Sequence, residues 1–571
     1  MRDYTGYCNV LSRSEWTYKL ETRNSKPEMP RLPGVLVLKG TMFSMVSHRR
    51  RALLATPLLW ATLPALAETP KNTIVMAKRI DDIISLDPAE SFEYSGSEIS
   101  GNIYEKLVSP AAADPTKIEP QLATSWTNSA DGLTWTFTLA DRRFASGAPV
   151  TAEDAAWSLQ RAVILNKAPG FIISQFGFTP ANVMERIRAT DPHTLVIQIA
   201  EREAPTFLLY CLSANVGGVV EKAVAMAHAT DNDLGNTWLR TNSAGSGAWV
   251  LRTARASELV ALDANPNHPS PPLARRMIIR HVADPSVQLL LLQQGDADIV
   301  RDLLPEGIKT ARANPAFEVI GVSKASLMHL SMNVRTPSLS HPEVREALRW
   351  AIDYQAIATN LTPETFDVHQ AFLPTGFPAA VTDNPYHYDP ARARALLAQA
   401  GFPGGIDLQF DHASSSPRAE IAQALQAQMH EAGIRLTLLA GEGRQILTKI
   451  RARQHQLAIS LWGSDYFDPH SNAQTFCVNE DNSDASTNRT TAWNQAWADP
   501  DLSARALAAV REQDAGRRVG LYEALQRDVM IRGPYAIMLQ ETSVAVLRRP
   551  VHGLELGPLS DRTVYGPIGK G

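Results

Sequence analysis

The stretch "EPQLATSWTNSADGLTWTFTLADRRFASGAPVTAEDAAWSLQRA" (residues 119–162) decides the expected fold class. In its middle, Leu133, Trp135 and Phe137 alternate with threonines, which places the apolar side chains on one face of a half-buried strand. Thr151 and Asp154 then stand at the spacing of a capping box, directly before an apolar helical pattern. The stretch therefore predicts strands that lead through a turn into a helix.

Strand and helix patterns alternate along the rest of the chain. The run "TLVIQIA" (residues 194–200) predicts another half-buried strand. In "YDPARARALLAQAGFPGG" (residues 388–405), Asp389 fits a helix cap, Pro390 the first helical position and Gly401 the residue just past the end. The apolar stripe of "HPEVREALRWAIDYQAIATNL" (residues 341–361) predicts a packing helix. The sequence thus indicates a compact α/β body without repeats.

Length and charge narrow the class of protein further. The chain has 571 residues, of which 44% are apolar and 20% charged, and its net charge is -4. Such a length exceeds one hydrophobic core, so we expect roughly two to four structural units. Because there is no basic excess, nucleic acid is not an expected partner.

A secretory signal peptide is predicted near the N-terminus, in "MVSHRRRALLATPLLWATLPALAETP" (residues 45–70). Three arginines, an apolar stretch and the sequence Ala65-Leu66-Ala67 predict a signal over residues 45–67, cut before Glu68. The apolar stretch is shorter than the ~20 residues of a spanning helix, so an uncleaved anchor is the disfavoured alternative. The arginines also fit twin-arginine export, and the export route stays open.

The residues before this signal, 1–44, are polar and irregular, and we interpret them as a non-native upstream extension. Translation is then expected to begin at Met45 or Met42 rather than Met1. Cys8 falls in this extension, which leaves Cys211 and Cys477 in the mature chain. We expect these two as separate buried thiols, with pairing as the alternative, because they are distant in sequence and form no CxxC.

Signatures of enzymes and metal sites fail at essential positions. "SAGSGAW" (residues 243–249) lacks the first glycine of a nucleophile elbow, and "HEAGI" (residues 430–434) has Ile434 where a zinc protease has its second histidine. The histidines are scattered without ligand spacing, so no metal or other cofactor is expected. A secreted hydrolase, with a triad assembled from distant residues, remains the alternative from another class of protein.

The stretch "LWGSDYFDP" (residues 461–469) is the candidate for chemistry. On the residues alone, Asp465 reads as a cap or loop carboxylate and Trp462 as core, and Asp468 before Pro469 reads as a turn cap. Two carboxylates three residues apart can also ligate a cation, which is a further alternative.

A resemblance covers nearly all of the mature chain. Residues 119–162, and in the same order "LDPAESFEYSGSEISGNIYEKL", "NSAGSGAWVL", "QQGDADIV", "LSMNVRTPSLSHPEVREALRWAIDYQAI", "YDPARARALLAQAGFPGG" and "LWGSDYFDP", resemble the family 5 extracellular solute-binding proteins. These are peptide- and nickel-binding receptors of ABC importers. The resemblance implies an α/β, two-lobed periplasmic binding protein fold of type II with a hinge between the lobes.

The resemblance also implies a domain plan. Lobe 1 would span residues 68–325, with an extra subdomain at about 112–240, and would be completed by residues 536–571. Lobe 2 would span residues 326–535. The crossings between the lobes are expected at residues 323–333 and 534–544. Ligand would lie between the lobes, which close by a hinge motion.

The resemblance assigns ligand contacts in both lobes. In peptide-binding members, an aspartate in a W-x-x-D segment receives the ammonium group of the ligand, and that aspartate matches Asp465. Trp462 would form a pocket wall, and Gly463, Ser464 and Tyr466 flank the site. In lobe 1 the matching strand end is Phe92, Glu93, Tyr94 and Ser95, with Tyr94 packing between the lobes as the alternative.

The sequence departs from the dipeptide receptors at the ligand's other end. Those receptors clamp the ligand carboxylate with an arginine. The matching loop here, "FDHASSSPRAE" (residues 410–420), is shorter and offers His412 and Arg418 as cationic candidates.

The sequence therefore predicts a periplasmic, monomeric receptor without catalytic residues. It would bind a peptide or peptide-like amine and deliver it to an inner-membrane ABC permease and ATPase complex. The alternative is the same fold with another cargo, such as an opine, a metal chelate, haem or an oligosaccharide, because a fold does not fix its ligand.

Overall fold

The structure is a computed structural model that describes residues 69–111, 114–486 and 488–571. These residues belong to the compact unit Pro64–Gly571. The predictions for the upstream extension, the signal peptide and Cys8 lie outside the described residues. No helix of the described residues is both long and apolar enough to span a membrane.

An eleven-stranded mixed sheet runs through the described part of the chain, in the order β15-β14-β16-β12-β17-β11-β1-β10-β9-β8, with β13 also paired to β17. Its strands are β1 (Thr73–Lys78), β8 (Trp249–Arg255), β9 (Leu259–Ala264), β10 (Arg276–His281), β11 (Ile299–Val300), β12 (Phe317–Met332), β13 (Phe366–Val368), β14 (Ile406–Ala413), β15 (Ile434–Gly441), β16 (Leu457–Gly463) and β17 (Tyr535–Arg548).

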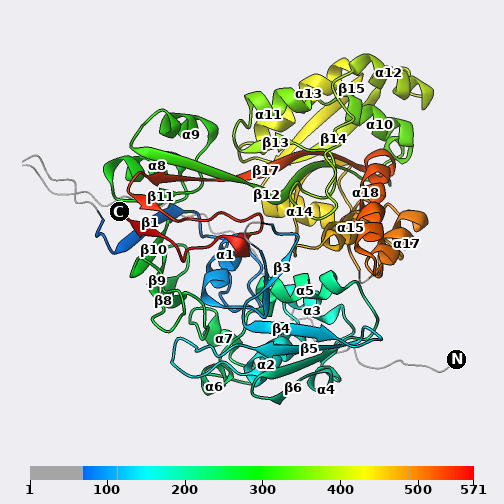
Figure 1. Ribbon diagram of the computed structural model, residues 1–571. Helices are drawn as coiled ribbons and strands as arrows, with labels where there is room; N and C mark the ends of the chain where they lie inside the picture. Colours follow the sequence, from blue (N-terminus) through cyan, green and yellow to red (C-terminus); the bar gives the residue numbers. More distant parts are fainter. Residues whose placement is uncertain (1–68, 112–113, 487) are drawn as a thin grey trace, which may run out of the picture. The chain divides into compact units, whose positions relative to one another are not determined.

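Two long antiparallel strands, β12 and β17, connect the two halves of this sheet (Figure 1). Near one end Phe317 pairs with Arg548, and this part of β17 also pairs with β11. Near the other end Ser331 pairs with Tyr535, and β12 also pairs with β16. The register breaks between Ser323 and Leu327, so the ladder is irregular at the middle of the pair. The predicted crossings at residues 323–333 and 534–544 overlap these strands.

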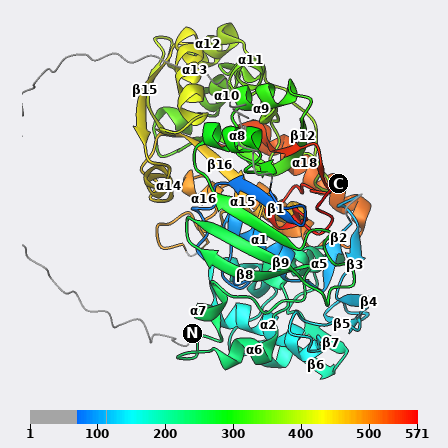
Figure 2. The ribbon, with the colours of Figure 1, turned by 90° about the vertical axis from the view of Figure 1, so that its left-hand side faces the viewer.

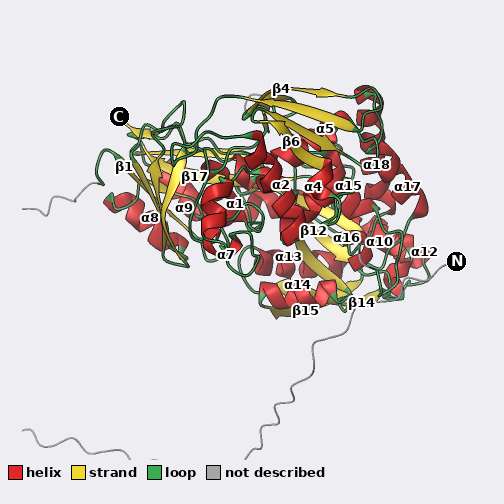
Figure 3. Cartoon of the chain, turned by 90° about the horizontal axis from the view of Figure 1, so that it is seen from below, coloured by secondary structure: helices red, strands yellow, loops and turns green. Residues whose placement is uncertain are grey.

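The predicted α/β architecture of two lobes is confirmed, and we name the lobes by their elements. The first lobe holds β1 to β11 with their helices and the C-terminal segment after β17, and the second holds β13 to β16 with theirs. Figure 2 shows α10 to α13 and β15 at one end and β4 to β7 with α2 at the other, with β1 and β16 between them. Each lobe contains both helices and strands (Figure 3). The residue boundaries expected for the lobes stay a prediction.

A separate antiparallel sheet, in the order β4-β5-β7-β6, lies within the residues expected for the extra subdomain. On β5, Trp135 and Phe137 are buried, as the alternation predicts, and they pack with the apolar residues of α2. The predicted capping box is present at the start of α2, where Thr151 and Asp154 hydrogen-bond each other's backbone N–H groups. The strands are β4 (Ala123–Asn128), β5 (Thr134–Leu139), β6 (Ile187–Asp191) and β7 (Thr194–Gln198).

The remaining strands form two short pairs. These are β2 (Val108–Pro110) with β3 (Ile118–Pro120), and β18 (Val551–His552) with β19 (Gly569–Lys570). The first-lobe helices are α1 (Tyr94–Ile103), α2 (Ala152–Leu165), α3 (Phe171–Ser174), α4 (Val183–Arg186), α5 (Pro205–Ser213), α6 (Lys222–Ala227), α7 (Asn236–Leu239), α8 (Pro285–Gln294) and α9 (Pro305–Arg312).

The second-lobe helices are α10 (Pro342–Trp350), α11 (Tyr354–Asn360), α12 (Pro390–Gln399), α13 (Arg418–Glu431), α14 (Gly443–Arg451), α15 (Pro469–Cys477), α16 (Thr491–Asn494), α17 (Pro500–Ala509) and α18 (Ala515–Arg532). Helix α12 begins as predicted, because the Asp389 side chain accepts a hydrogen bond from the Arg392 N–H and Pro390 occupies the first turn. Gly401 follows with a φ of 91°, which favours glycine.

Cys211 and Cys477 are free and buried in different hydrophobic clusters. The prediction of separate buried thiols is therefore confirmed. Burial raises the pKa of both thiols, which keeps them protonated and unreactive.

Candidate ligand-binding site

A cavity of about 590 Å³ lies between the lobes and is bordered by β12. The first lobe contributes Asp82, Ser91, Phe92, Glu93, Tyr94, Ser97, Pro169, Ile172, Asn215, Val216 and residues 558–561 to its wall. The second lobe contributes Leu447, Ile450, Arg451, residues 460–465, Thr475, Arg489, Thr491, Asn494 and Gln495. From β12 come Lys324, Ala325, His329 and Ser331. Since both lobes and a connecting strand supply wall residues, a molecule in this cavity would contact all three.

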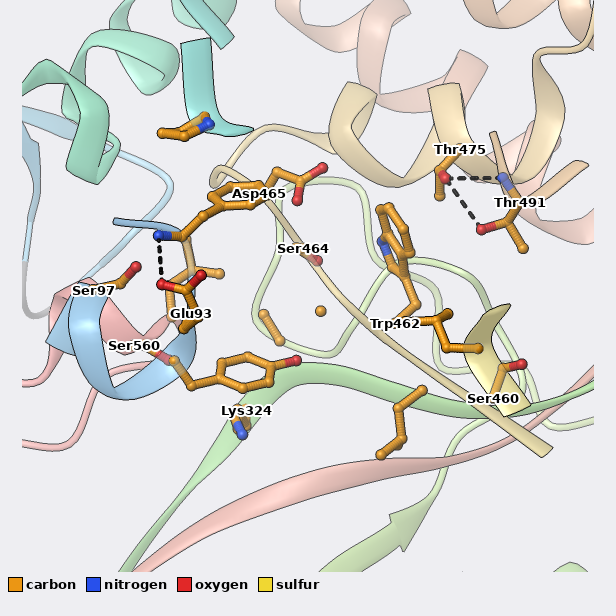
Figure 4. A pocket seen from close by; sticks show the side chains of 18 of the residues that line it. Glu93, Ser97, Lys324, Ser460, Trp462, Ser464, Asp465, Thr475, Thr491 and Ser560 are labelled. Atoms are coloured by element: carbon orange, nitrogen blue, oxygen red, sulfur yellow. Dashed lines mark hydrogen bonds between the residues drawn. The ribbon is translucent and has the colours of Figure 1, made fainter. Parts of the chain in front are cut away.

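The loop between β16 and α15 presents Asp465 to this cavity. The apolar run of β16 ends at Gly463, and α15 begins at Pro469, so the loop between them is short. Its backbone is held in place, since the Ser464 N–H donates to the Ala325 carbonyl at 2.9 Å and the Asp465 N–H to Ser471 Oγ at 3.0 Å. These hydrogen bonds fix the backbone from which the Asp465 side chain extends at the cavity wall (Figure 4).

The Asp465 carboxylate forms no hydrogen bond or salt bridge with another described residue. The side chain is half-buried, and this burial raises the pKa of Asp465 to about 7. A carboxylate that has lost part of its hydration without gaining a cation is costly when ionised. A cation that enters the cavity would relieve this cost.

Asp468 has a different environment, although it lies three residues further along. Its carboxylate is buried and accepts hydrogen bonds from Arg518 at 2.7 and 3.0 Å. It also accepts the His470 N–H at 2.9 Å, so the prediction that Asp468 caps a turn is confirmed. The pair with Arg518 was not predicted. It argues against a shared cation site, and the described residues contain no group of three metal-ligating side chains.

Trp462 lines the same cavity as Asp465. Its ring meets the Phe476 ring edge to face, with centroids 6.3 Å apart. Gly463 and Ser464 also line the cavity. Tyr466 does not, because its side chain is buried in the hydrophobic cluster that also holds residues of β5 and α2, and it lies against Phe207.

In the first lobe, Phe92, Glu93 and Tyr94 line the cavity. The Tyr94 ring lies under the Lys324 ammonium at 4.2 Å, and Lys324 pairs with Glu541 at 2.9 Å. The Tyr94 hydroxyl also touches Gly463, where an added Cβ would overlap it. Tyr94 therefore both lines the cavity and packs between the lobes.

Besides Tyr466, three further residues predicted at the site are placed elsewhere or at its margin. Ser95 donates its N–H to Asp82 and lines a neighbouring cavity of about 610 Å³. Arg418, the first residue of α13, lines the same neighbouring cavity. His412 is buried in β14, where Nδ1 lies 3.0 Å from the Ala413 carbonyl oxygen. The structure thus brings neither His412 nor Arg418 to the cavity that holds Asp465.

Several wall residues were missed by the sequence reasoning. Arg451 and Arg489 are exposed cations at the wall, on α14 and in the loop before α16, and no motif marks either of them. His329 and Ser331 come from β12 and are buried. The signal for these two was available, since they are polar residues at alternate positions of the otherwise apolar run "SLMHLSM".

Comparison with known proteins identifies the family. The model of the bacterial extracellular solute-binding proteins, family 5 Middle, matches residues 117–484. The chain belongs to this family. The solute-binding protein is 25% identical over 520 residues to the probable D,D-dipeptide-binding periplasmic protein DdpA of Escherichia coli (strain K12), covering 90% of this chain and 97% of DdpA.

Solved structures support the fold of this solute-binding protein. The periplasmic binding protein DppA from Helicobacter pylori, in complex with the peptide STSA, is similar with a TM-score of 0.73 and 22% identity, covering 87% of this chain and 98% of DppA. MoaA from A. tumefaciens R10, in complex with mannopinic acid, is similar with a TM-score of 0.72 and 21% identity, covering 88% of this chain and 100% of MoaA. The predicted two-lobed periplasmic binding protein fold is thus confirmed.

Proposed function

We propose that this solute-binding protein is the periplasmic receptor of an ABC importer and captures peptides or peptide-like amines by closing its lobes. One observation carries the proposal: Asp465 presents a half-buried carboxylate without a protein cation to a cavity that both lobes line. The free ammonium group of a peptide would supply the missing charge. The family membership and the similarity to DdpA support this choice of cargo.

The other wall residues fit an extended amine ligand. Trp462 supplies an aromatic wall beside the carboxylate, and Tyr94 closes the cavity from the first lobe. Arg451 and Arg489 are cations on the second-lobe wall that can receive a ligand carboxylate. They would replace His412 and Arg418, which the sequence suggested for that role.

The proposal includes the processing and partners expected from the sequence. The protein would be exported with the signal at residues 45–67, would act as a monomer without bond chemistry of its own, and would deliver its cargo to a membrane permease and ATPase complex. The crossings would lie at residues 323–333 and 534–544, where β12 and β17 connect the lobes. N-terminal sequencing of the exported protein tests the cleavage site, and a mature chain that retains any residue before Glu68 would contradict it.

Native mass spectrometry of protein purified from the exporting cell is the test of the cargo. We expect a retained ligand with a free amine, released unchanged. Calorimetry then compares free-amine peptides with their N-acetylated forms, which lack the charge for Asp465. Asp465→Asn should bind neither form, whereas Asp481→Asn, which removes an exposed carboxylate outside the cavity wall, should bind like the wild type. Equal affinity of acetylated and free peptides would refute the ammonium site.

A further inference from the structure

The floor of the cavity is one face of the paired strands β12 and β16. Along β12, Met328, Leu330 and Met332 belong to the hydrophobic core of the second lobe. The alternate residues His329 and Ser331 face the opposite way and line the cavity. A strand that is buried on both faces normally carries apolar residues on both of them. Polar residues at positions 329 and 331 of β12 are therefore unusual.

The partner strand continues this polar face. Ser460 of β16 is directly opposite His329, and Trp462 is opposite Leu327. Directly opposite residues of an antiparallel pair share a face. The Ser331 hydroxyl donates to Ser460 Oγ at 3.3 Å, across the two strands. We call His329, Ser331, Ser460 and Trp462 the polar floor.

The polar floor carries hydrogen-bonding atoms that no described residue satisfies. His329 is 2% exposed, and neither of its ring nitrogens makes a hydrogen bond of normal distance and angle with a described residue. The indole nitrogen of Trp462 and Oδ1 of Asn494, on the neighbouring wall, are also buried atoms without a hydrogen-bond partner among the described residues. More than about 90% of buried polar groups in proteins are hydrogen-bonded. Several unsatisfied atoms around one cavity therefore indicate that their partners come from a bound molecule.

These groups are uncharged. Burial lowers the pKa of His329 to about 4, so its imidazole is neutral at physiological pH and offers one donor and one acceptor. The rings of Phe476 and Tyr535 meet it edge to face at 5.5 and 5.8 Å. Figure 4 shows Trp462 between Asp465 on one side and Thr475 and Thr491 on the other. The threonine hydroxyls, 3.3 Å apart, extend the uncharged polar wall.

We infer that the polar floor binds an uncharged hydrogen-bonding group of the ligand, a carboxamide or a hydroxyl, on the same molecule whose ammonium group Asp465 receives. This inference rests on the proposed function and narrows its cargo to amines with a neutral polar substituent. A carboxamide matches the floor well, because it offers donors and an acceptor to the imidazole, the indole N–H and the Asn494 carbonyl.

Other substituents fit the floor less well. An apolar side chain would bury the imidazole and the indole N–H without hydrogen-bond partners, which weakens the binding of such a ligand. A charged side chain would lose its hydration beside neutral groups and find no counter-ion in the floor. A site built from unpaired polar atoms selects against ligands that lack the matching group.

Calorimetry with matched dipeptides tests the inference on the unmodified protein. Free-amine Xaa-Ala dipeptides are compared in pairs of similar size, with glutamine against methionine, asparagine against leucine and threonine against valine at the first position. We expect the polar member of each pair to bind at least about tenfold more tightly. Equal or tighter binding of the apolar members would overturn this inference and leave the ammonium site intact. Binding of neither member would count against the proposed peptide function as well.

Variants locate the preference in the polar floor. His329→Leu should remove the preference for glutamine over methionine, as measured by the ratio of the two dissociation constants. Ser331→Ala with Ser460→Ala should reduce that ratio and gives a second measurement if His329→Leu does not fold. Ser213→Ala, which removes a fully buried serine of α5 outside the cavity wall, should leave the ratio unchanged. A preference that persists in both floor variants would overturn the inference.

Discussion

At the scale of single residues, two aspartates three positions apart have opposite roles. The Asp468 charge is neutralised inside the protein by Arg518, whereas the Asp465 charge meets no protein cation. The difference depends on α18, which brings Arg518 to Asp468 from 50 residues further along the chain. The local sequence shows the two aspartates, but it does not show that only one of them is paired with a distant arginine.

The pKa of Asp465 predicts a pH optimum for binding. Since burial raises this pKa to about 7, the carboxylate becomes protonated as the pH falls through that value. Affinity for a free-amine peptide should then fall by up to about tenfold per pH unit below about 7. Above about pH 8 the peptide amine loses its proton, and affinity should fall again. Calorimetry across this range checks the bell shape.

A control separates Asp465 from other acids at the cavity. Burial also raises the pKa of Glu93, which lines the same wall. If protonation of Asp465 causes the loss of affinity below about pH 7, the Glu93→Gln variant should show the same loss. If the affinity of Glu93→Gln no longer fell at low pH, Glu93 rather than Asp465 would be the group that titrates, which would contradict the role given to Asp465.

The buried pair of Asp468 and Arg518 should be important for stability rather than for binding. Asp468→Asn leaves the buried guanidinium without its counter-ion, and breaking such a pair costs about 3–5 kcal/mol. Urea unfolding of the ligand-free protein measures this loss. Asp407→Asn is the matched control, because it breaks the exposed pair of Asp407 with Arg435 and should leave the unfolding free energy nearly unchanged. A similar small loss for Asp468→Asn would contradict the structural role.

At the scale of elements, local sequence was a good guide. The capping box before α2, the cap and proline of α12 and the alternation in β5 were predicted and are confirmed. These features depend on neighbours within a few residues, which a sequence shows directly. The polar floor was not predicted, because it needs the pairing of β12 with β16 from distant parts of the chain.

Gly463, the last residue of β16, should be intolerant of a side chain. A Cβ there would overlap the Tyr94 hydroxyl of the first lobe and force Tyr94 out of its position. Gly463→Ala should therefore weaken ligand binding by about tenfold, corresponding to an overpacking cost of about 1–3 kcal/mol. Calorimetry measures the affinity, and thermal melting of the ligand-free protein should change little, since Tyr94 can turn away when the cavity is empty.

A double variant tests this cause. Tyr94→Phe removes the hydroxyl that the Cβ would meet, so adding it to Gly463→Ala should recover part of the lost affinity. Tyr94→Phe alone serves as the reference for any loss from the hydroxyl itself. Additive losses in the double variant would show that the two residues do not act on each other.

At the scale of the whole described unit, the sequence predicted the architecture better than the site. The order of segments indicated a two-lobed solute-binding protein, and the family match and the solved structures confirm it. The wall of the cavity, in contrast, is assembled from segments between Asp82 and Asp561 that the fold brings together. Arg451 and Arg489 carry no local signature, so their position followed from the structure alone.

The arrangement of the wall predicts how the unit responds to cargo. A ligand held by Asp465 and by first-lobe residues contacts both lobes in the closed state and one lobe in an open state, so it favours closure. Between Ser323 and Leu327 the pairing of β12 with β17 is interrupted where the lobes join, which suits a hinge. We expect a free-amine peptide with a neutral polar first side chain to lower the radius of gyration in small-angle X-ray scattering.

The same peptide should also stabilise the fold, by about 2.7 kcal/mol at a free concentration one hundred times its dissociation constant. Its N-acetylated form, at the same concentration, should change neither the radius of gyration nor the unfolding free energy. Stabilisation without compaction would mean that the ligand binds one lobe in a structure that is already closed. That outcome would contradict closure by hinge motion, because a ligand moves an equilibrium between two states only when it binds one of them more tightly.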